Sequence, residues 1–376
     1  MTPARLRVTP RSSRCSFHEQ KGLFAERTAT NSRRWFLRSS VLGALADSTA
    51  GRLFAQPPAG DQFGRLFTPS TRQAIKDGLA YLASQQNQDS SFGTGSYSHN
   101  VAVGGLCGMA FLANGSTPGR GRYGRHLRRC VDFILQNCQP SGLIAHGESA
   151  SRGPMYGHGF ATLFLAEVYG MPPISGLRNK LAKAVELIVN TQNSAGGWRY
   201  EPRRNEADIS VTVCQVMALR AARNAGLHVP NETIDRAIDY IKRCQNSDGG
   251  FMYLATRTGE SDFPRSAAAI VAMYSAGIYT GDEIDHGLAY LMQHPPKLNE
   301  MGQTNYFFYG HYYAVQAMWH AGGKHWRTWY PAIRDVLLAQ QQDDGSWRAM
   351  INPEYGTAMA CLVLQMPSNY LPIFQR

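Results

Sequence analysis

The sequence has 376 residues, of which 43% are hydrophobic and 17% are charged, a composition typical of a globular protein with a substantial core. The formal net charge is +11, but residues 1–55 hold 10 basic and 3 acidic residues and so account for +7 of it. The remaining +4 is spread over the rest of the chain, which excludes the concentrated basic surface of a nucleic-acid-binding protein. No run of about 18 apolar residues is present, so no transmembrane span is expected in the mature chain.

The basic N-terminal segment has the features of an export signal. Ser32–Arg38 reads SRRWFLR, which resembles the twin-arginine signal with its terminal lysine replaced by arginine. An apolar stretch over 39–46 and small residues suited to cleavage follow it. We therefore expect residues 1–55 to be a twin-arginine signal peptide and leader, 56–69 to be a linker, and the mature protein to be periplasmic or otherwise extracytoplasmic. A basic disordered tail is the alternative, and fractionation of cells would distinguish the two.

A short motif, in which a glutamine is followed by a glycine-rich turn and an aromatic residue, recurs along the rest of the chain. Its four clear copies run from Gln86 to Phe92, from Gln192 to Trp198, from Gln245 to Phe251 and from Gln341 to Trp347. Two degenerate copies begin at Gln136 and Gln293, so the six glutamines are 50, 56, 53, 48 and 48 residues apart. A fixed period of this length indicates a repeat architecture. Six units fill residues 70–370 and leave 371–376 as a C-terminal tail.

Each repeat predicts two helices of different character. The segment before each glutamine, from IKDGLAYLASQ in the first repeat to IRDVLLAQ in the last, has apolar residues on one face and charges on the other. The segment after each turn, from VAVGGLCGMAFLA to GTAMACLVLQ, is apolar on every side and must be covered on every side. The sequence therefore predicts an all-α fold, an α6/α6 toroid with the amphipathic helices outside and the apolar helices inside. An open helical solenoid is the alternative, although its terminal helices should be more polar than GTAMACLVLQ.

The Q-x-x-x-G-x-W turn in the third and sixth copies resembles the repeat of the squalene cyclase and protein prenyltransferase superfamily. The resemblance covers residues 70–370 and implies a terpenoid-cyclase-like toroid. In that family the glutamine and the aromatic residue tie neighbouring helix ends together. We expect the aromatic side chain to be buried and the glutamine to bond an unpaired backbone group at a helix end. These residues are therefore assigned a structural role.

The central opening of such a toroid is the expected binding site. Six inner helices that begin at the same rim present their positive ends and free N–H groups there, which suits an anion. The turns at this rim carry the arginines Arg152, Arg199, Arg203, Arg204 and Arg265. Below them the inner helices offer the apolar side chains Phe160, Phe164, Met217, Tyr274, Tyr312, Tyr313 and Trp319. This pattern predicts an isoprenoid or lipid ligand with an anionic head, with Arg199 and Arg265 as head-group contacts. In the alternative, the arginines are solvated and the aromatic residues only fill the core.

Asp208 is the candidate catalytic residue. Class II cyclases, which belong to the same superfamily, protonate an alkene or epoxide with the middle aspartate of a D-x-D-D-T motif, and the nearest segment here is EADISVT from Glu206 to Thr212. The resemblance therefore implies an acid at Asp208, although the paired aspartate that would tune it is missing. The alternative is that Asp208 caps the helix that begins at Ile209.

A pair of Tyr-Gly-His triplets marks a second candidate site. Tyr156 and His158 open the second inner helix, and Tyr309 and His311 open the fifth, so the triplets should face each other across a six-fold ring. They form a ligand or metal site, or the histidines bond to loop carbonyls. The zinc ligands of protein prenyltransferases are absent, since the Asp-x-Cys of that family is replaced by Tyr309-Gly310-His311 and its histidine by Gly356. We therefore expect neither a metal nor a cofactor.

Three functions are compatible with these features. The first is enzymatic action on an isoprenoid, of the terpenoid-cyclase kind. The second is a non-catalytic lipid-binding or scaffold toroid. The third is a carbohydrate-active α6/α6 barrel that uses two rim carboxylates. Candidates for that pair are Glu148, Asp208, Glu260, Asp262 and Glu354. Neither the identity of the ligand nor the oligomeric state follows from the sequence.

Overall fold

The computed structural model describes residues 66–93, 95–147, 153–298 and 306–375. These residues form twelve α-helices and, in place of a sheet, only four isolated β-bridges. No helix in these ranges is long and apolar enough to cross a bilayer. The signal peptide and leader predicted for 1–55 and most of the 56–69 linker lie outside the described residues, so export stays a prediction.

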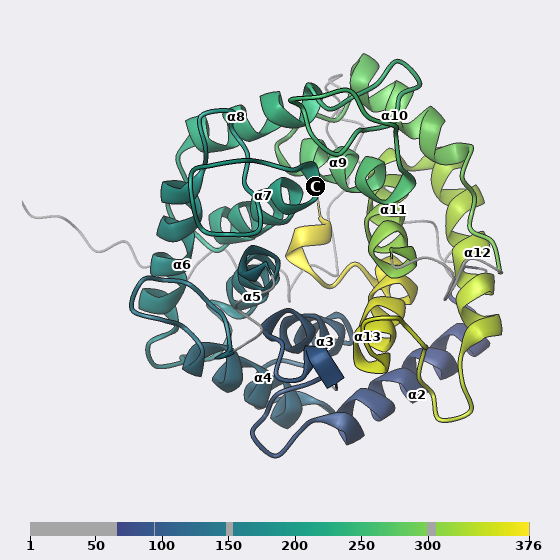
Figure 1. The fold of residues 1–376 in the computed structure, drawn as a ribbon. Coiled ribbons are helices and arrows are strands. Elements are labelled where there is room, and N and C mark those ends of the chain that lie inside the picture. The colour runs from purple at the N-terminus through teal and green to yellow at the C-terminus, as the bar shows by residue number, and fades with distance from the viewer. Residues whose placement is uncertain (1–65, 94, 148–152, 299–305, 376) are drawn as a thin grey trace, which may run out of the picture. The chain divides into compact units, whose positions relative to one another are not determined.

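The helices alternate between two concentric rings in the order of the chain (Figure 1). The outer ring consists of α2 (Pro69–Gln85), α4 (Gly124–Gln136), α6 (Leu177–Thr191), α8 (Asn231–Lys242), α10 (Asp282–Met292) and α12 (Gly323–Gln340). The inner ring consists of α3 (Val101–Ala113), α5 (Pro154–Val168), α7 (Ile209–Asn224), α9 (Phe263–Ser275), α11 (Phe307–Ala321) and α13 (Pro353–Leu364). Nearly every residue of the inner helices is buried, whereas the outer helices bury only one face. The predicted α6/α6 toroid is confirmed, and its cause is the difference in apolar pattern between the two sets of helices.

The repeat glutamines join each turn to the next outer helix. Gln192 Nε2 donates to the Gly196 carbonyl of its own turn and to the Thr233 carbonyl of α8, both at 2.8 Å. Gly196 has φ +96°, and a Cβ there would lie 2.1 Å from the Arg236 carbonyl of α8. Glycine is therefore required, because the turn needs a left-handed conformation and a close approach to the neighbouring backbone.

The repeat tryptophans bond the ends of the outer helices. Trp198 Nε1 donates to the Ile188 carbonyl at 2.8 Å, and Trp347 Nε1 donates to the Leu337 carbonyl at the same distance. Each carbonyl belongs to the last four residues of its helix, which have no partner within the helix. The expectation that the glutamine bonds this unpaired group is therefore wrong in detail. The indole does so, and the glutamine bonds its own turn and the adjacent helix.

The last repeat closes onto the first. Gln341 Nε2 donates to the Ala74 carbonyl of α2 at 3.0 Å, the bond that Gln86, Gln192 and Gln245 make to their next outer helices. On the inner ring α13 packs against α3, so no helical face is left open at either end of the array. The open solenoid is therefore wrong.

The residues after α13 fill the centre of the ring at one end. The chain continues through the short 3₁₀ turns Met366–Ser368 (η4) and Pro372–Phe374 (η5), and η5 packs against α7 on the far side of the ring from α13 (Figure 1). Ile373 and Phe374 are both buried. The segment 371–376, expected only as a tail, thus supplies core residues as far as it is described.

Candidate functional site

A cavity of about 780 Å³ lies where the inner helices begin. Its lining residues come from the first two turns of inner helices or from the loops that lead into them. Seven of them are tyrosines, namely Tyr97, Tyr156, Tyr200, Tyr253, Tyr306, Tyr309 and Tyr355. The expectation that the inner helices share a rim, and that this rim forms a pocket, therefore agrees with the structure.

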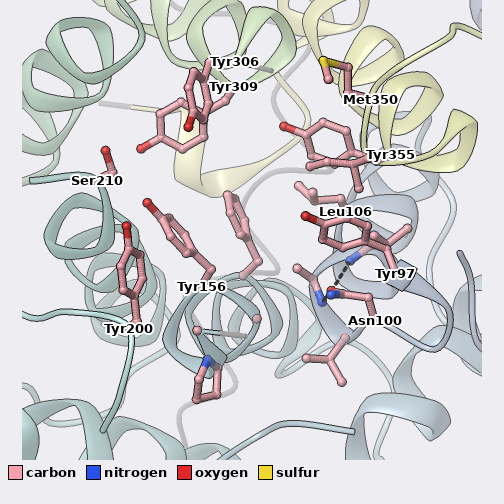
Figure 2. A pocket seen from close by; sticks show the side chains of 18 of the residues that line it. Tyr97, Asn100, Leu106, Tyr156, Tyr200, Ser210, Tyr306, Tyr309, Met350 and Tyr355 are labelled. Atoms are coloured by element: carbon pink, nitrogen blue, oxygen red, sulfur yellow. Dashed lines mark hydrogen bonds between the residues drawn. The ribbon is translucent and has the colours of Figure 1, made fainter. Parts of the chain in front are cut away.

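One side of the cavity is rich in hydroxyl groups, and we call it the hydroxyl wall. It consists of Tyr156, Tyr200, Ser210, Tyr253 and Tyr309. Figure 2 shows the side chains of Tyr156, Tyr200 and Ser210 gathered on this side, with Tyr309 above them. The hydroxyls of Tyr200 and Tyr253 are hydrogen-bonded to each other. Burial raises the pKa values of Tyr156 and Tyr309 well above their usual range, so both phenols stay protonated and neutral.

The opposite side of the cavity carries fewer polar groups, and we call it the apolar wall. Leu106 and Met350 lie there, across the cavity from the hydroxyl wall, together with the rings of Tyr97 and Tyr355, whose hydroxyls are polar groups on this side (Figure 2). Phe160, Val101 and Ile351 are among the other apolar lining residues. At the mouth several large side chains are exposed, including Tyr306 at 58% and Met350 at 61%. The cavity is therefore amphiphilic, with one hydroxylated wall and one apolar wall.

The predicted positive rim is largely neutralised. Arg265 lines the cavity, but its guanidinium pairs with Asp262 at 3.1 Å and also donates to the Phe251 and Glu260 carbonyls. Arg199 lies outside the cavity lining and forms an ion pair with Glu206.

The other two described rim arginines, Arg203 and Arg204, do not line the cavity. Arg204 donates to a backbone carbonyl, and Arg152 lies outside the described residues. The assignment of Arg199 as a head-group contact is therefore wrong, because its guanidinium lies outside the lining and is paired with Glu206.

The two histidines of the Tyr-Gly-His triplets do not reach the cavity. His158 is completely buried, with Nδ1 accepting from the Ile144 N–H at 3.1 Å and Nε2 donating to the Ala184 carbonyl at 3.2 Å. Burial lowers its pKa to about 4, so the imidazole is neutral. The interpretation in which it bonds to backbone groups is the one the structure shows.

His311 lies in an aromatic pocket of its own. Its ring centroid is 4.5 Å from that of Phe307 and 5.0 Å from that of Phe263, and burial lowers its pKa to about 3. The assignment of both histidines as ligand-binding residues is therefore wrong. The tyrosines of the same triplets, Tyr156 and Tyr309, do line the cavity, so the two triplets meet through their first residues.

Asp208 caps α7 directly behind the hydroxyl wall. Its Oδ1 accepts from the Val211 N–H at 2.9 Å, while Oδ2 is buried without a well-formed hydrogen bond. Burial raises the pKa of the carboxyl to about 6, against the lowering effects of the Val211 N–H, the Arg199 charge and the Tyr253 hydroxyl. The predicted cap is present. Asp208 does not itself line the cavity, but its neighbours Ser210 and Tyr253 do.

The remaining candidate carboxylates are dispersed. Among the described residues that line the cavity, Asp262 is the one carboxylate, and it is paired with Arg265. Glu354 is buried outside the lining, Glu260 is exposed, and Glu148 lies outside the described residues. No group of three His, Cys, Asp or Glu side chains that could hold a metal occurs in the described ranges.

The predicted apolar funnel is filled rather than open. Of its members only Phe160 lines the cavity. Five others are fully or almost fully buried, namely Phe164, Met217, Tyr274, Tyr312 and Tyr313. Trp319 packs against Trp326 of the outer helix α12. Tyr312 contacts Phe374 of the C-terminal segment, with ring centroids 6.3 Å apart. These side chains are core, and the cavity is confined to the mouth of the ring.

Several lining residues were not predicted from the sequence, although a signal for three of them exists. Tyr200 and Tyr253 each follow a repeat aromatic by two residues, in Trp198-Arg199-Tyr200 and Phe251-Met252-Tyr253. The repeat aromatic is buried at a fixed point below the rim, so the residue two positions later is carried to the rim in both copies. Tyr355 is the third residue of its inner helix and precedes a glycine, as Tyr156 and Tyr309 do, whereas Tyr97 has no such regular position.

Comparisons with known proteins agree with this architecture. A family model described as the squalene-hopene cyclase C-terminal domain matches residues 161–302. No curated protein sequence matches the chain significantly. Among solved structures, the apo type II terpene cyclase MstE from Scytonema aligns with a TM-score of 0.57 at 14% identity, covering 80% of this chain and 99% of that chain. Its complex with the product merosterolic acid A gives 0.56 at 14% identity, covering 80% and 97%.

A second group of similar structures acts on carbohydrate. The α-1,6-mannanase of glycoside hydrolase family 76 from a Salegentibacter species aligns with a TM-score of 0.61 at 8% identity, covering 80% of this chain and 99% of that chain. Identities this low establish the fold alone. The resemblance to the terpenoid-cyclase-like α/α toroid superfamily is thus confirmed at the level of the fold.

Proposed function

Given its terpenoid-cyclase-like α/α toroid, we propose that the protein binds an isoprenoid or another amphiphilic lipid in the tyrosine-lined cavity. The observation that carries the proposal is the division of the cavity into a hydroxyl wall and an apolar wall. A volume of about 780 Å³ falls within the range of roughly 300–1,000 Å³ typical of small-molecule sites. The exposed Tyr306 and Met350 at the mouth offer apolar contacts to an entering chain.

A cyclase-like activity is the second candidate, and Asp208 favours it. Its buried carboxyl has a pKa raised to about 6, so a fraction stays protonated near neutral pH, as a general acid requires. Tyrosine faces around the cavity would stabilise a cation formed on the substrate. The similar cyclase MstE is described in complex with the substrate geranylgeranyl dihydroxybenzoate, an isoprenoid conjugate. The proton would have to pass through Tyr253 or Ser210, because Asp208 lies behind the lining.

The carbohydrate alternative has less support. Glycoside hydrolysis needs two carboxylates that face the scissile bond, one as acid and one as base or nucleophile. The lining residues within the described ranges supply Asp262 alone, and Arg265 is bound to it. The similarity to the mannanases is therefore one of fold.

A binding and turnover assay on the full-length protein tests both candidates. We expect native mass spectrometry to detect a one-to-one complex with a geranylgeranyl compound, and we expect α-1,6-mannotriose not to bind. Chromatography of the recovered lipid then shows whether it has been isomerised. Asp208→Asn should leave binding unchanged, since Asn is an equally good N-cap, and should abolish any turnover. Binding without turnover in either protein would leave a lipid-binding toroid, and absence of binding to any isoprenoid would overturn the proposal.

A further inference from the structure

We propose that the hydroxyl wall binds an uncharged head group that carries a hydroxyl, such as an alcohol or a phenol, at one end of the lipid chain. This inference rests on the proposed function, because it assumes that the chain of the ligand lies against the apolar wall. It replaces the anionic head group expected from the sequence. Three features of the cavity lead to it: the balance of charge, the hydroxyl groups of the hydroxyl wall and the difference between the two walls.

The charge balance of the cavity disfavours an anion. Within the described lining, the ionisable groups other than tyrosines are Asp262 and Arg265, and they form an ion pair. Arg199, which directly precedes Tyr200 of the hydroxyl wall in the sequence, is bound to Glu206, while the carboxyl of Asp208 lies directly behind the wall. A diphosphate placed here would lose its hydration without gaining a free cation among the residues that the structure describes, and it would lie beside carboxylates.

Part of the hydroxyl wall offers hydrogen-bond acceptors. The hydroxyls of Tyr200 and Tyr253 are hydrogen-bonded to each other, so one of their two protons is engaged in that bond. Both oxygens keep lone pairs that can accept a proton from a ligand in the cavity.

The other part of the hydroxyl wall offers donors. Tyr156 and Tyr309 remain protonated because burial raises the pKa of both phenols, and the nearby Ser210 hydroxyl opposes this only in part. The buried Tyr309 hydroxyl makes no well-formed hydrogen bond in the structure. Buried hydroxyls are nearly always paired, so a donor at this position calls for a partner from a ligand.

A single hydroxyl group fits both parts of the wall. It accepts from Tyr309 or Tyr156 and donates to Tyr200, whereas a hydrocarbon end satisfies neither and an anion has no proton to donate. The apolar wall with Leu106 and Met350 lies across the cavity from these hydroxyls (Figure 2). A chain lying there would bring its hydroxylated end to the tyrosines.

The test compares three probes that share one chain. Dissociation constants of the full-length protein are measured by calorimetry for geranylgeraniol, geranylgeranyl diphosphate and the matching hydrocarbon that ends in a methyl group. We expect the alcohol to bind at least tenfold more tightly than either of the others. The double variant Tyr156→Phe/Tyr309→Phe, which keeps both rings, should weaken alcohol binding at least fivefold and change hydrocarbon binding by less than twofold.

Tyr370→Phe is the matched control, because Tyr370 is exposed at 63% and does not line the cavity. It should bind all three probes as the wild type does. If the double variant does not fold, Ser210→Ala alone should reduce the preference for the alcohol over the hydrocarbon. Tighter binding of the diphosphate, or equal binding of the alcohol and hydrocarbon, would overturn the head-group proposal while leaving the proposed function intact. If no probe binds, the proposed function itself is overturned.

Discussion

The two ends of the ring formed by residues 66–375 are built from the same inner helices but have opposite properties. At the end where these helices begin, tyrosines and a serine surround an open cavity. At the other end, the C-terminal segment crosses the ring and buries Leu371, Ile373 and Phe374 (Figure 1). The comparison shows why the site is at one end only: residues beyond the last repeat fill the other.

The helix termini explain why the open end is not a strong anion site. Asn100 caps α3, Asp208 caps α7 and Asn352 caps α13, each by accepting from backbone N–H groups in the first turn. These side chains satisfy donors that would otherwise face the cavity. The positive ends of three of the six inner helices are therefore partly used by the chain itself.

The largest effect is expected at the closed end. Phe374→Ala should lower the free energy of unfolding by about 3–5 kcal/mol, because it leaves a void beside Tyr312 in a filled core. Urea denaturation followed by circular dichroism measures this. Tyr370→Ala, in the same segment but exposed, should change the stability by less than about 0.5 kcal/mol. Equal effects of the two variants would mean that the segment is not part of the core.

An intermediate effect is expected behind the cavity, at Asp208. Its folded-state pKa of about 6 lies above the ordinary value of 3.8, so the folded state binds a proton that the unfolded state has lost between these pH values. Stability should therefore fall as pH rises from 4 to 6, by up to about 3 kcal/mol.

Asp208→Asn removes this titration and keeps the cap. Relative to the wild type, the variant should thus gain stability between pH 4 and pH 7, as determined from denaturation curves at each pH. A difference between the two proteins that does not vary with pH would show that the carboxyl titrates normally. Asp208→Ala should cost about 1 kcal/mol more than Asp208→Asn, through loss of the cap.

The smallest effect on stability is expected at the open end. Met350→Ser and Tyr306→Ser should each change the free energy of unfolding by less than about 0.5 kcal/mol, since both side chains are exposed at the mouth. They should nevertheless slow the uptake of a geranylgeranyl compound severalfold, as followed by stopped-flow fluorescence. Unchanged uptake would indicate that these side chains do not contact the entering chain.

The sequence by itself was sufficient to predict the architecture. Amphipathic and apolar helices alternate in every repeat, and this pattern assigns each helix to the outer or the inner ring without knowledge of the contacts. The cap at Asp208 was also predictable, because N-capping depends on residues within one turn of the helix. The shared rim followed in turn, since inner helices separated by one outer helix must run parallel.

Only the tertiary structure decided which side chains face the cavity. Tyr156 and His158 are two positions apart and so lie about 200° apart around α5, which means that one triplet cannot present both to the same space. The helical period places Tyr156 and His158 on opposite faces of α5, but the packing of α5 against its neighbours decides that the tyrosine is the one that faces the cavity. The charge of the rim was decided in the same way: Arg199 is neutralised by Glu206 and Arg265 by Asp262, pairings set by how the loops fold against the ring. Repeats encode backbone geometry through local periodicity, whereas the direction and partners of a side chain depend on residues that meet only when the ring closes.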